Sequence, residues 1–161
     1  ILLMFPPVFI TIIFLFNTKN GKAFIDRLDL KTLTLLHIVR IPVEICLLWL
    51  FFAKAIPELM TFEGRNFDII AGITAPLVFF LYFKRKSISK NILLGWNVIM
   101  LLLLINIIVN ALLSAPLPIQ QFAFDQPNIG ILYFPYVWLP AFIVPAAFFS
   151  HLVAIRRLRK S

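Results

Sequence analysis

Apolar residues in this chain form long continuous runs, and polar residues gather in the short segments between them. A helix that crosses a bilayer needs about 20 mostly apolar residues. The runs do not alternate apolar and polar side chains, so they predict helices and not a closed barrel of strands. The pattern predicts an all-α, polytopic transmembrane helix bundle, a single domain over residues 1–161. Its five expected spans are residues 1–16, 33–53, 69–83, 92–113 and 131–155.

The composition supports this prediction. Of the 161 residues, 61% are hydrophobic and 14% are charged, and the mean hydropathy is +0.98. An ordinary soluble domain is about 45–50% apolar and about 25% charged. A soluble fold of this size cannot cover so much apolar surface, which excludes a soluble globular enzyme. The single cysteine, Cys46, excludes a disulfide scaffold.

The basic residues predict how the helices are oriented. Of the 15 Lys and Arg residues, all but Arg40, Lys54 and Arg65 lie in residues 17–32, residues 84–91 or the C-terminal tail. The positive-inside rule therefore places these two loops and the C-terminus in the cytoplasm. Charge clustered between apolar runs is typical of membrane loops, so the expected partner is the lipid bilayer and not nucleic acid.

The first run begins at Ile1 with no basic segment before it and no small-residue cleavage site after it, which argues against a signal peptide. Five helices with a cytoplasmic C-terminus place residue 1 on the outer side. We therefore expect the first run to be cut short and the complete protein to have six helices. The outer segments 57–68 and 115–130 are expected to pack over the bundle as a cap.

The second run carries three ionisable side chains, His37, Arg40 and Glu44, at spacings that place them on one helical face. Each charge at a bilayer centre costs about 2.5–3.5 kcal/mol, so this face should turn into the bundle. Arg40 and Glu44 can pair along it, and Pro42 frees a carbonyl one turn earlier. Two interpretations remain open: a buried ionisable centre that binds or passes a small solute, ion or proton, and an ion pair that only fixes helix packing.

The fourth run carries a polar stripe, with residues spaced by four. The favoured interpretation is hydrogen bonding between helices. The alternative is the polar lining of a cavity that faces Glu44, with a contact between Glu44 and Asn106. Asn97 lies on the opposite side of this helix and is interpreted as an interface residue. The stripe consists of Asn106, Asn110 and Ser114.

The two histidines, His37 and His151, lie at similar depth on different helices. This is the arrangement that a bis-histidine haem or a metal site requires. Interfacial or hydrogen-bonded histidines are the favoured alternative. Apart from this haem hypothesis, the sequence predicts no cofactor.

Two strings, His-Ile-Val-Arg-Ile-Pro-Val-Glu at 37–44 and Met-Thr-Phe-Glu-Gly-Arg-Asn-Phe-Asp at 60–68, resemble those of small multi-pass bacterial inner-membrane proteins with no assigned activity. The resemblance implies location in the inner (plasma) membrane and says nothing about chemistry. Phosphate-binding, zinc-protease and serine-nucleophile motifs are absent from the sequence, so a non-enzymatic function is expected. Three hypotheses follow: solute, ion or proton binding, a structural or assembly subunit of a membrane complex or homo-oligomer, and a haem-binding redox protein.

Overall fold

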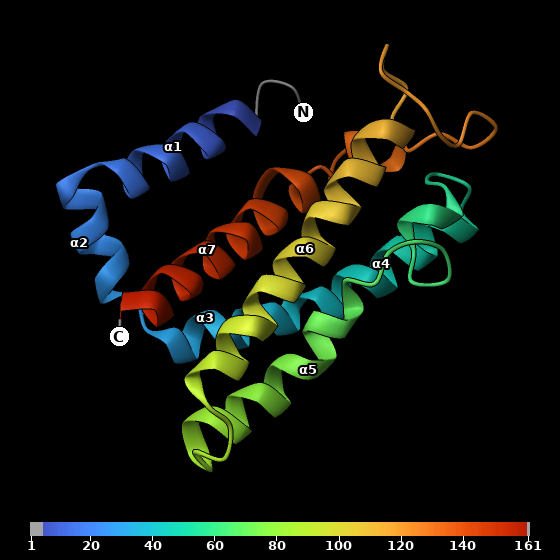
Figure 1. The fold of residues 1–161 in the computed structure, drawn as a ribbon. Helices are drawn as coiled ribbons and strands as arrows, with labels where there is room; N and C mark the ends of the chain where they lie inside the picture. The colour runs from blue at the N-terminus through green and yellow to red at the C-terminus, as the bar shows by residue number, and fades with distance from the viewer. Residues whose placement is uncertain (1–4, 161) are drawn as a thin grey trace.

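The computed structural model describes residues 5–160, and these residues are 73% helical with no strand (Figure 1). The predicted all-α class is confirmed. Residues 1–4 of the first apolar run lie outside the described part of the chain. The α-helices are α1 Phe5–Asn17, α2 Lys19–Arg27, α3 Leu30–Leu36, α4 Arg40–Phe52, α5 Ile69–Phe79, α6 Lys90–Ser114 and α7 Val144–Lys160. The short elements are the 3₁₀ turns η1 His37–Val39, η2 Glu58–Met60 and η4 Gly130–Leu132, and the π-helical turns η3 Phe80–Lys84 and η5 Leu139–Ile143.

Three continuous helical segments are long and apolar enough to cross a membrane: residues 30–52, 90–114 and 139–160. A fourth is added if the bent pair α1 and α2, whose axes differ by 93°, counts as one span. The segment Ile69–Lys84 is apolar but shorter. The fifth expected span starts later than predicted, because residues 131–138 form a turn and loop before η5 begins. Length and composition therefore give three or four spans among the described residues, and not the five expected.

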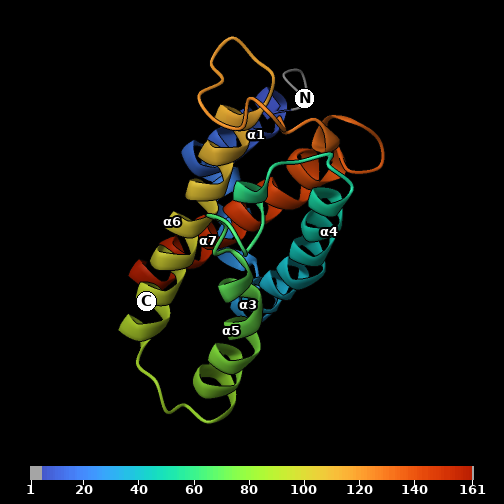
Figure 2. The ribbon, with the colours of Figure 1, turned by 90° about the vertical axis from the view of Figure 1, so that its right-hand side faces the viewer.

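The long helices pack side by side, and their outer surfaces also carry large apolar side chains. α6 packs along α7, while α5 packs against α3, η1 and α4 (Figures 1 and 2). Leu47, Leu104 and Ala147 belong to the buried cluster between these helices. The opposite face of α6 exposes large apolar side chains. These are Ile99, Leu102, Ile105 and Val109.

Proline and glycine determine where the helices bend and how closely they approach. The 3₁₀ turn η1 lies just before Pro42, whose ring would clash with the carbonyl of Ile38 in a regular α-helix. Pro140 lies inside the π-helical turn η5. Gly72 allows α5 to pack closely against α4, since a Cβ there would lie 2.8 Å from Ile41 Cγ1 and 3.1 Å from its backbone nitrogen.

The segment between α4 and α5 turns back into the bundle. Figure 2 shows it running down beside α4, and α5 begins level with the start of that helix, where Asp68 pairs with Arg40. Asn66 hydrogen-bonds Glu44, eight residues before α4 ends at Phe52, which is about 12 Å along the helix axis. Gly64 makes the turn compact, because a Cβ there would overlap the backbone of Glu58 and Leu59.

The second long loop covers this segment, as the expectation of a cap implied. The backbone nitrogens of Ile129 and Gly130 both donate to the carbonyl of Ala55, at 3.1 and 2.7 Å. A Cβ at Gly130 would lie 3.0 Å from the Cβ of Ala55, so glycine allows this approach. The two loops therefore form one layer at the end of the molecule opposite to α2 and the C-terminus (Figure 1).

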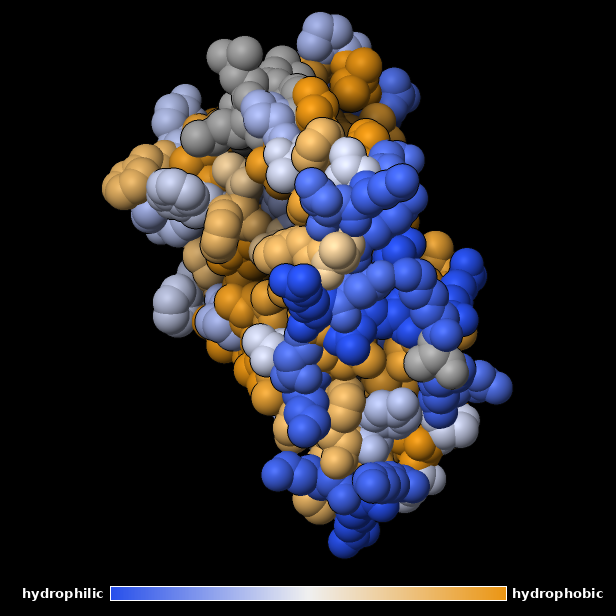
Figure 3. All heavy atoms as spheres, turned by 90° about the vertical axis from the view of Figure 1, so that its left-hand side faces the viewer, coloured by the Kyte–Doolittle hydropathy of each residue, from blue (hydrophilic) through white to orange (hydrophobic). Residues whose placement is uncertain are grey.

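The other end of the molecule joins α2 to the end of α7. Ile25 is fully buried against Leu33 and Val153, while the Asp26 carboxylate pairs with Arg156 at 3.1 Å and Lys160 at 2.6 Å. These two cations hold the pKa of Asp26 below its ordinary value. Viewed from this end, hydrophilic residues gather on one part of the surface beside a broad apolar area (Figure 3).

Candidate functional site

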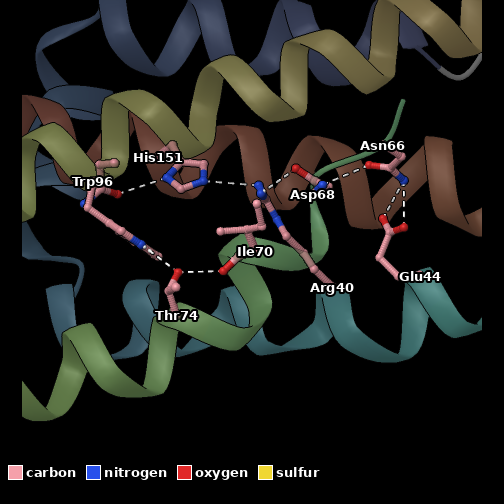
Figure 4. Close-up of polar contacts among 9 residues, drawn as sticks. Arg40, Glu44, Asn66, Asp68, Ile70, Thr74, Trp96 and His151 are labelled. Carbon is pink, nitrogen blue, oxygen red and sulfur yellow. Dashed lines mark hydrogen bonds and ion pairs between the residues drawn. The ribbon is translucent and has the colours of Figure 1, made fainter. Parts of the chain in front are cut away.

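A buried polar network crosses the middle of the molecule, with Arg40 at its centre (Figure 4). Arg40 Nη1 donates to Asp68 Oδ1 at 2.8 Å, and Arg40 Nη2 contacts His151 Nε2 at 3.1 Å. The side chain of Arg40 is 2% exposed and that of Asp68 is 8% exposed. α4, the start of α5 and α7 are thus joined through one guanidinium.

The partners of His151 determine its tautomer. A guanidinium has donors only, so His151 Nε2 accepts its hydrogen bond and carries no proton. His151 Nδ1 therefore bears the hydrogen and donates to Asn97 Oδ1 at 3.0 Å. The Asn97 amide is itself oriented by its donation to the carbonyl of Leu93 at 2.9 Å. His151 is thus neutral, and the network extends into α6.

Glu44 joins the same network through the loop before α5. Asn66 Nδ2 donates to Glu44 Oε1 at 2.7 Å and Oε2 at 2.8 Å, and it also contacts the carbonyl of Met60 at 3.0 Å. Asn66 Oδ1 accepts the backbone N–H of Asp68 at 3.0 Å. One asparagine therefore links the carboxylate of Glu44 to the residue that pairs with Arg40.

Two expected contacts of Glu44 are replaced by contacts with this loop. The helical spacing predicted that Arg40 and Glu44 would pair, but the ion pair of Arg40 is with Asp68. The contact between Glu44 and Asn106, which belonged to the alternative interpretation of the polar stripe, is also not formed, since Asn106 donates to the carbonyl of Arg65 at 2.9 Å. The inserted segment provides closer partners for both side chains.

Asp68 is the ionisable residue that the loop before α5 contributes to the network. Burial raises the pKa of its carboxyl to about 6, and the guanidinium of Arg40 opposes that rise. The pair therefore loses its negative partner when the pH falls below about 6.

A cavity of about 410 Å³ adjoins the Glu44 end of the network. Glu44 and Asp68 are its acidic wall residues. The rest of the wall is apolar and comes from α4, the two loops, α6, η5 and the start of α7. Those residues include Val43, Leu47, Met60, Ile107, Ala111, Ile131, Leu139 and Val144. Sites for small molecules commonly have this size and this mixture of apolar wall and few polar groups.

The polar stripe of α6 holds the loops and does not line this cavity. Besides the contact of Asn106 with Arg65, Asn110 Nδ2 donates to the carbonyl of Asn106 at 3.1 Å, and Ser114 Oγ donates to that of Asn110 at 2.7 Å. The carbonyl of Ser114 in turn accepts the backbone N–H of Asn128 at 2.8 Å. The stripe therefore joins α6 to loops and not to another helix.

The two histidines predicted to lie at similar depth are in direct contact. The rings of His37 and His151 stack with centroids 3.8 Å apart and an interplanar angle of 11°, and Trp96 packs edge-on to both. Neither ring nitrogen of His37 has a hydrogen-bond partner among the described residues.

This stacking does not fit a bis-histidine haem. Axial imidazoles point their nitrogens at the iron from opposite faces of the macrocycle, but here the rings of His37 and His151 lie face to face with no space between them. Both ring nitrogens of His151 are also occupied, Nε2 by Arg40 and Nδ1 by Asn97. Among residues 5–160, no group of three or more His, Cys, Asp or Glu side chains could hold a metal ion.

The sequence interpretation missed three members of the network: Asn66, Asp68 and Asn97. Asn66 and Asp68 entered the prediction only as part of the outer segment 57–68, and Asn97 was interpreted as an interface residue. A signal for the first two was present in the length of the third apolar run. Residues 69–84 form a helix of about 24 Å, which is shorter than a hydrocarbon core of about 30 Å. A helix this short can begin deeper in the bundle than the ends of the neighbouring helices.

The fold and the site define a small all-helical protein with apolar helices around a buried ionisable network. The sequence model of a protein family, described as a domain of unknown function (DUF8737), matches residues 2–159. The chain therefore belongs to this family. Neither the curated proteins nor the solved structures include a match.

Proposed function

We propose that this chain is an integral protein of the bacterial inner (plasma) membrane, and that it binds a small solute in the cavity beside Glu44. The membrane location is supported by the apolar outer surface. Only 28–33% of the most apolar stretch of each long helix is buried. Exposed apolar area of this extent is stable in lipid and not in water. The basic loops 17–32 and 84–91 and the C-terminus face the cytoplasm in this proposal.

The observation that carries the binding function is the position of Glu44 in the wall of an otherwise apolar cavity. Glu44 is 1% exposed, so its charge is expensive unless a partner compensates it. Asn66 provides hydrogen bonds but no charge. A carboxylate kept in such a place is more easily explained by a ligand than by packing, because a buried charge is weak support for stability.

The cavity opens toward the proposed lipid-facing surface. Two wall residues, Leu112 and Leu132, are 36% and 37% exposed. The wall between them belongs to the end of α6 and to the loop before η5. A solute that partitions into the bilayer can therefore reach Glu44 from the side, between α6 and η5.

Binding is tested with two probes of nearly the same shape, phenyltrimethylammonium and tert-butylbenzene, added to the protein in lipid nanodiscs. The protein carries ¹³C-labelled isoleucine δ1-methyl groups. We expect at least one probe to shift the methyl signals of Ile107, Ile108 and Ile131, which line the cavity. The variant Ala111→Phe fills the cavity and should abolish those shifts. If neither probe shifts them, or if the filled variant responds equally, the binding proposal is overturned.

The membrane orientation is tested by labelling single cysteines with a membrane-impermeant maleimide, after Cys46→Ala removes the native thiol. Ser87 and Gln121 lie in opposite loops and are both exposed. Gln121→Cys should react in intact cells, and Ser87→Cys only after permeabilisation. The opposite result would invert the proposed topology, and labelling of both in intact cells would refute it.

A further inference from the structure

We infer that the ligand of this cavity is a monovalent organic cation with an apolar body, and that it exchanges with a proton at Glu44. The inference rests on the proposed function, and it names the ligand class for that site. It is carried by the charges around the cavity and by the chemistry of its wall.

The buried network holds one more acid than base. Its ionisable members are Glu44, Asp68 and Arg40, all at most 5% exposed as whole residues. His151 is neutral because it accepts from Arg40 at one nitrogen and donates from the other. Two carboxylates against one guanidinium leave a net charge of −1. A buried charge that is not compensated costs several kcal/mol, so one further positive charge is required.

Arg40 does not provide that charge to the cavity. Its Nη1 and Nη2 atoms are held by Asp68 and His151, and Arg40 is not among the residues that line the cavity. From the other elements, α6, η5 and α7 bring only apolar side chains to the wall, as do the loops apart from Asp68. His151 lies on the side of Arg40 away from Glu44 (Figure 4), and His37 stacks on His151. The missing positive charge must therefore come from a proton or from a bound ligand.

The wall determines what kind of cation fits. Among the described residues, no Phe, Tyr or Trp ring lines the cavity, so these residues offer a cation no aromatic face. The carboxylates at one end are its only charged groups, and the remainder consists of aliphatic side chains and Met60. This favours a single charge at one end of an apolar body. A hydrated metal ion would find few oxygen ligands here, because hard cations require six or more.

The proton and the organic cation are mutually exclusive at Glu44. When the carboxyl is protonated, the network is neutral and the cation gains nothing from the site. When the cation binds, the carboxyl of Glu44 releases its proton to water, and the resulting carboxylate becomes the counter-ion of the cation. Charge balances in this exchange, since one positive charge enters as another leaves. The site thus couples binding of the solute to release of one proton.

The test compares the same two probes across pH. Phenyltrimethylammonium carries a fixed charge at every pH, and tert-butylbenzene is its neutral counterpart. Binding is followed by the methyl signals of Ile107 and Ile131 in nanodiscs. We expect the cation to bind at least tenfold more tightly at pH 9 than at pH 7, a range that lies above the pKa of about 6 of Asp68, and to approach about tenfold per pH unit where one proton is fully displaced. Binding of the neutral probe should not change with pH.

The variant Glu44→Gln should lose at least tenfold in affinity for the cation and keep its affinity for the neutral probe. Methyl signals far from the cavity show whether the variant is folded, and if it is not, the pH series on the unaltered protein still decides. Equal binding of the two probes at pH 9, or cation binding independent of pH, would overturn the inference and leave the binding proposal intact. Failure of both probes would instead refute the binding proposal itself.

Discussion

The two ends of the buried network differ in how completely their polar groups are paired by neighbouring residues. Around Arg40, His151 and Asn97, each donor nitrogen has an acceptor except for Arg40 Nε. Around Glu44, one neutral amide contacts both carboxylate oxygens and the remaining side faces a cavity. The first end is built as a joint between four helices. The second end is built as an open site.

This difference separates the two interpretations that the sequence left open. Arg40 fixes the packing of helices, with Asp68 as its partner, and our proposal assigns ligand binding to Glu44. The following predictions test this division, in order of decreasing expected effect.

The largest effect is expected for Arg40→Met. It leaves the Asp68 carboxylate buried without its cation, which costs about 3–5 kcal/mol of unfolding free energy. The matched change at the open end, Glu44→Gln, should cost less than about 1 kcal/mol, since Asn66 keeps an acceptor. Denaturant unfolding in detergent micelles measures both values. The double variant Arg40→Met/Asp68→Leu should recover most of the loss. Equal losses of unfolding free energy in the two single variants would contradict this division of roles between Arg40 and Glu44.

The next effect is a pH dependence that comes from Asp68. Burial raises its pKa from 3.8 to about 6. The folded protein therefore holds this proton more tightly than the unfolded chain does, so the contribution to stability is present below pH 3.8 and is lost as the pH rises through 6. The difference is on the order of 3 kcal/mol. Unfolding free energies between pH 4 and pH 7.5 should fall less steeply in Asp68→Asn. Parallel curves would show that Asp68 does not titrate in this range.

A smaller effect is expected for Asn97→Leu, which removes the acceptor of His151 Nδ1–H and should cost about 1–3 kcal/mol. The same substitution at Asn106, on the same helix, removes a more exposed bond to a loop and should cost less. Nitrogen NMR of His151 provides a second readout. Arg40 still holds the same neutral tautomer, but the Nδ1 signal should shift in Asn97→Leu, because its proton loses its acceptor, and stay unchanged in Asn106→Leu. An unchanged His151 spectrum in the first variant would argue against this network.

The smallest effect is expected at the surface, for Asp26→Asn. Lys160 and Arg156 lower the pKa of Asp26, so its contribution is present above pH 3.8 and is lost as the pH falls below that value. Hydrogen exchange of the α2 amides should become faster in the variant, with global unfolding unchanged. Asp29→Asn is the control, because Asp29 caps α3 through Thr32 and does not contact α7. Unchanged exchange in α2 would show that Ile25 alone holds this helix.

Hydropathy predicted most of the fold, because long apolar runs have few alternatives to helix. Residues 33–53 and 92–113 are helical nearly to the expected ends, at 30–52 and 90–114. Hydropathy does not indicate how deep in the bundle a polar segment lies. It could not show that the segment 57–68 turns back between the helices, since the hydrogen bonds that hold it there come from side chains spread over the chain, such as Asn106 and Asn66.

The site was predicted in part for a similar reason. Helical spacing placed His37, Arg40 and Glu44 on one face, and all three are buried there. The spacing could not identify the partners of these side chains. Arg40 contacts Asp68 and His151, which lie 28 and 111 residues away, and Glu44 contacts Asn66, which lies 22 residues away. Asn97 was misjudged because α6 is buried on two sides, toward α7 and toward the loops. A single polar stripe is therefore an incomplete guide to such a helix.

The order in which a ribosome makes the chain gives the contact between Arg40 and His151 a further consequence. Arg40 is synthesised 28 residues before Asp68 and 111 residues before His151. Until Asp68 is made, the nascent helix has its arginine and lacks both of these partners, and until His151 is made it still lacks one of them. The network can therefore close only after the chain has been made as far as His151 in α7, and a chain that stops before that residue leaves Arg40 incompletely paired.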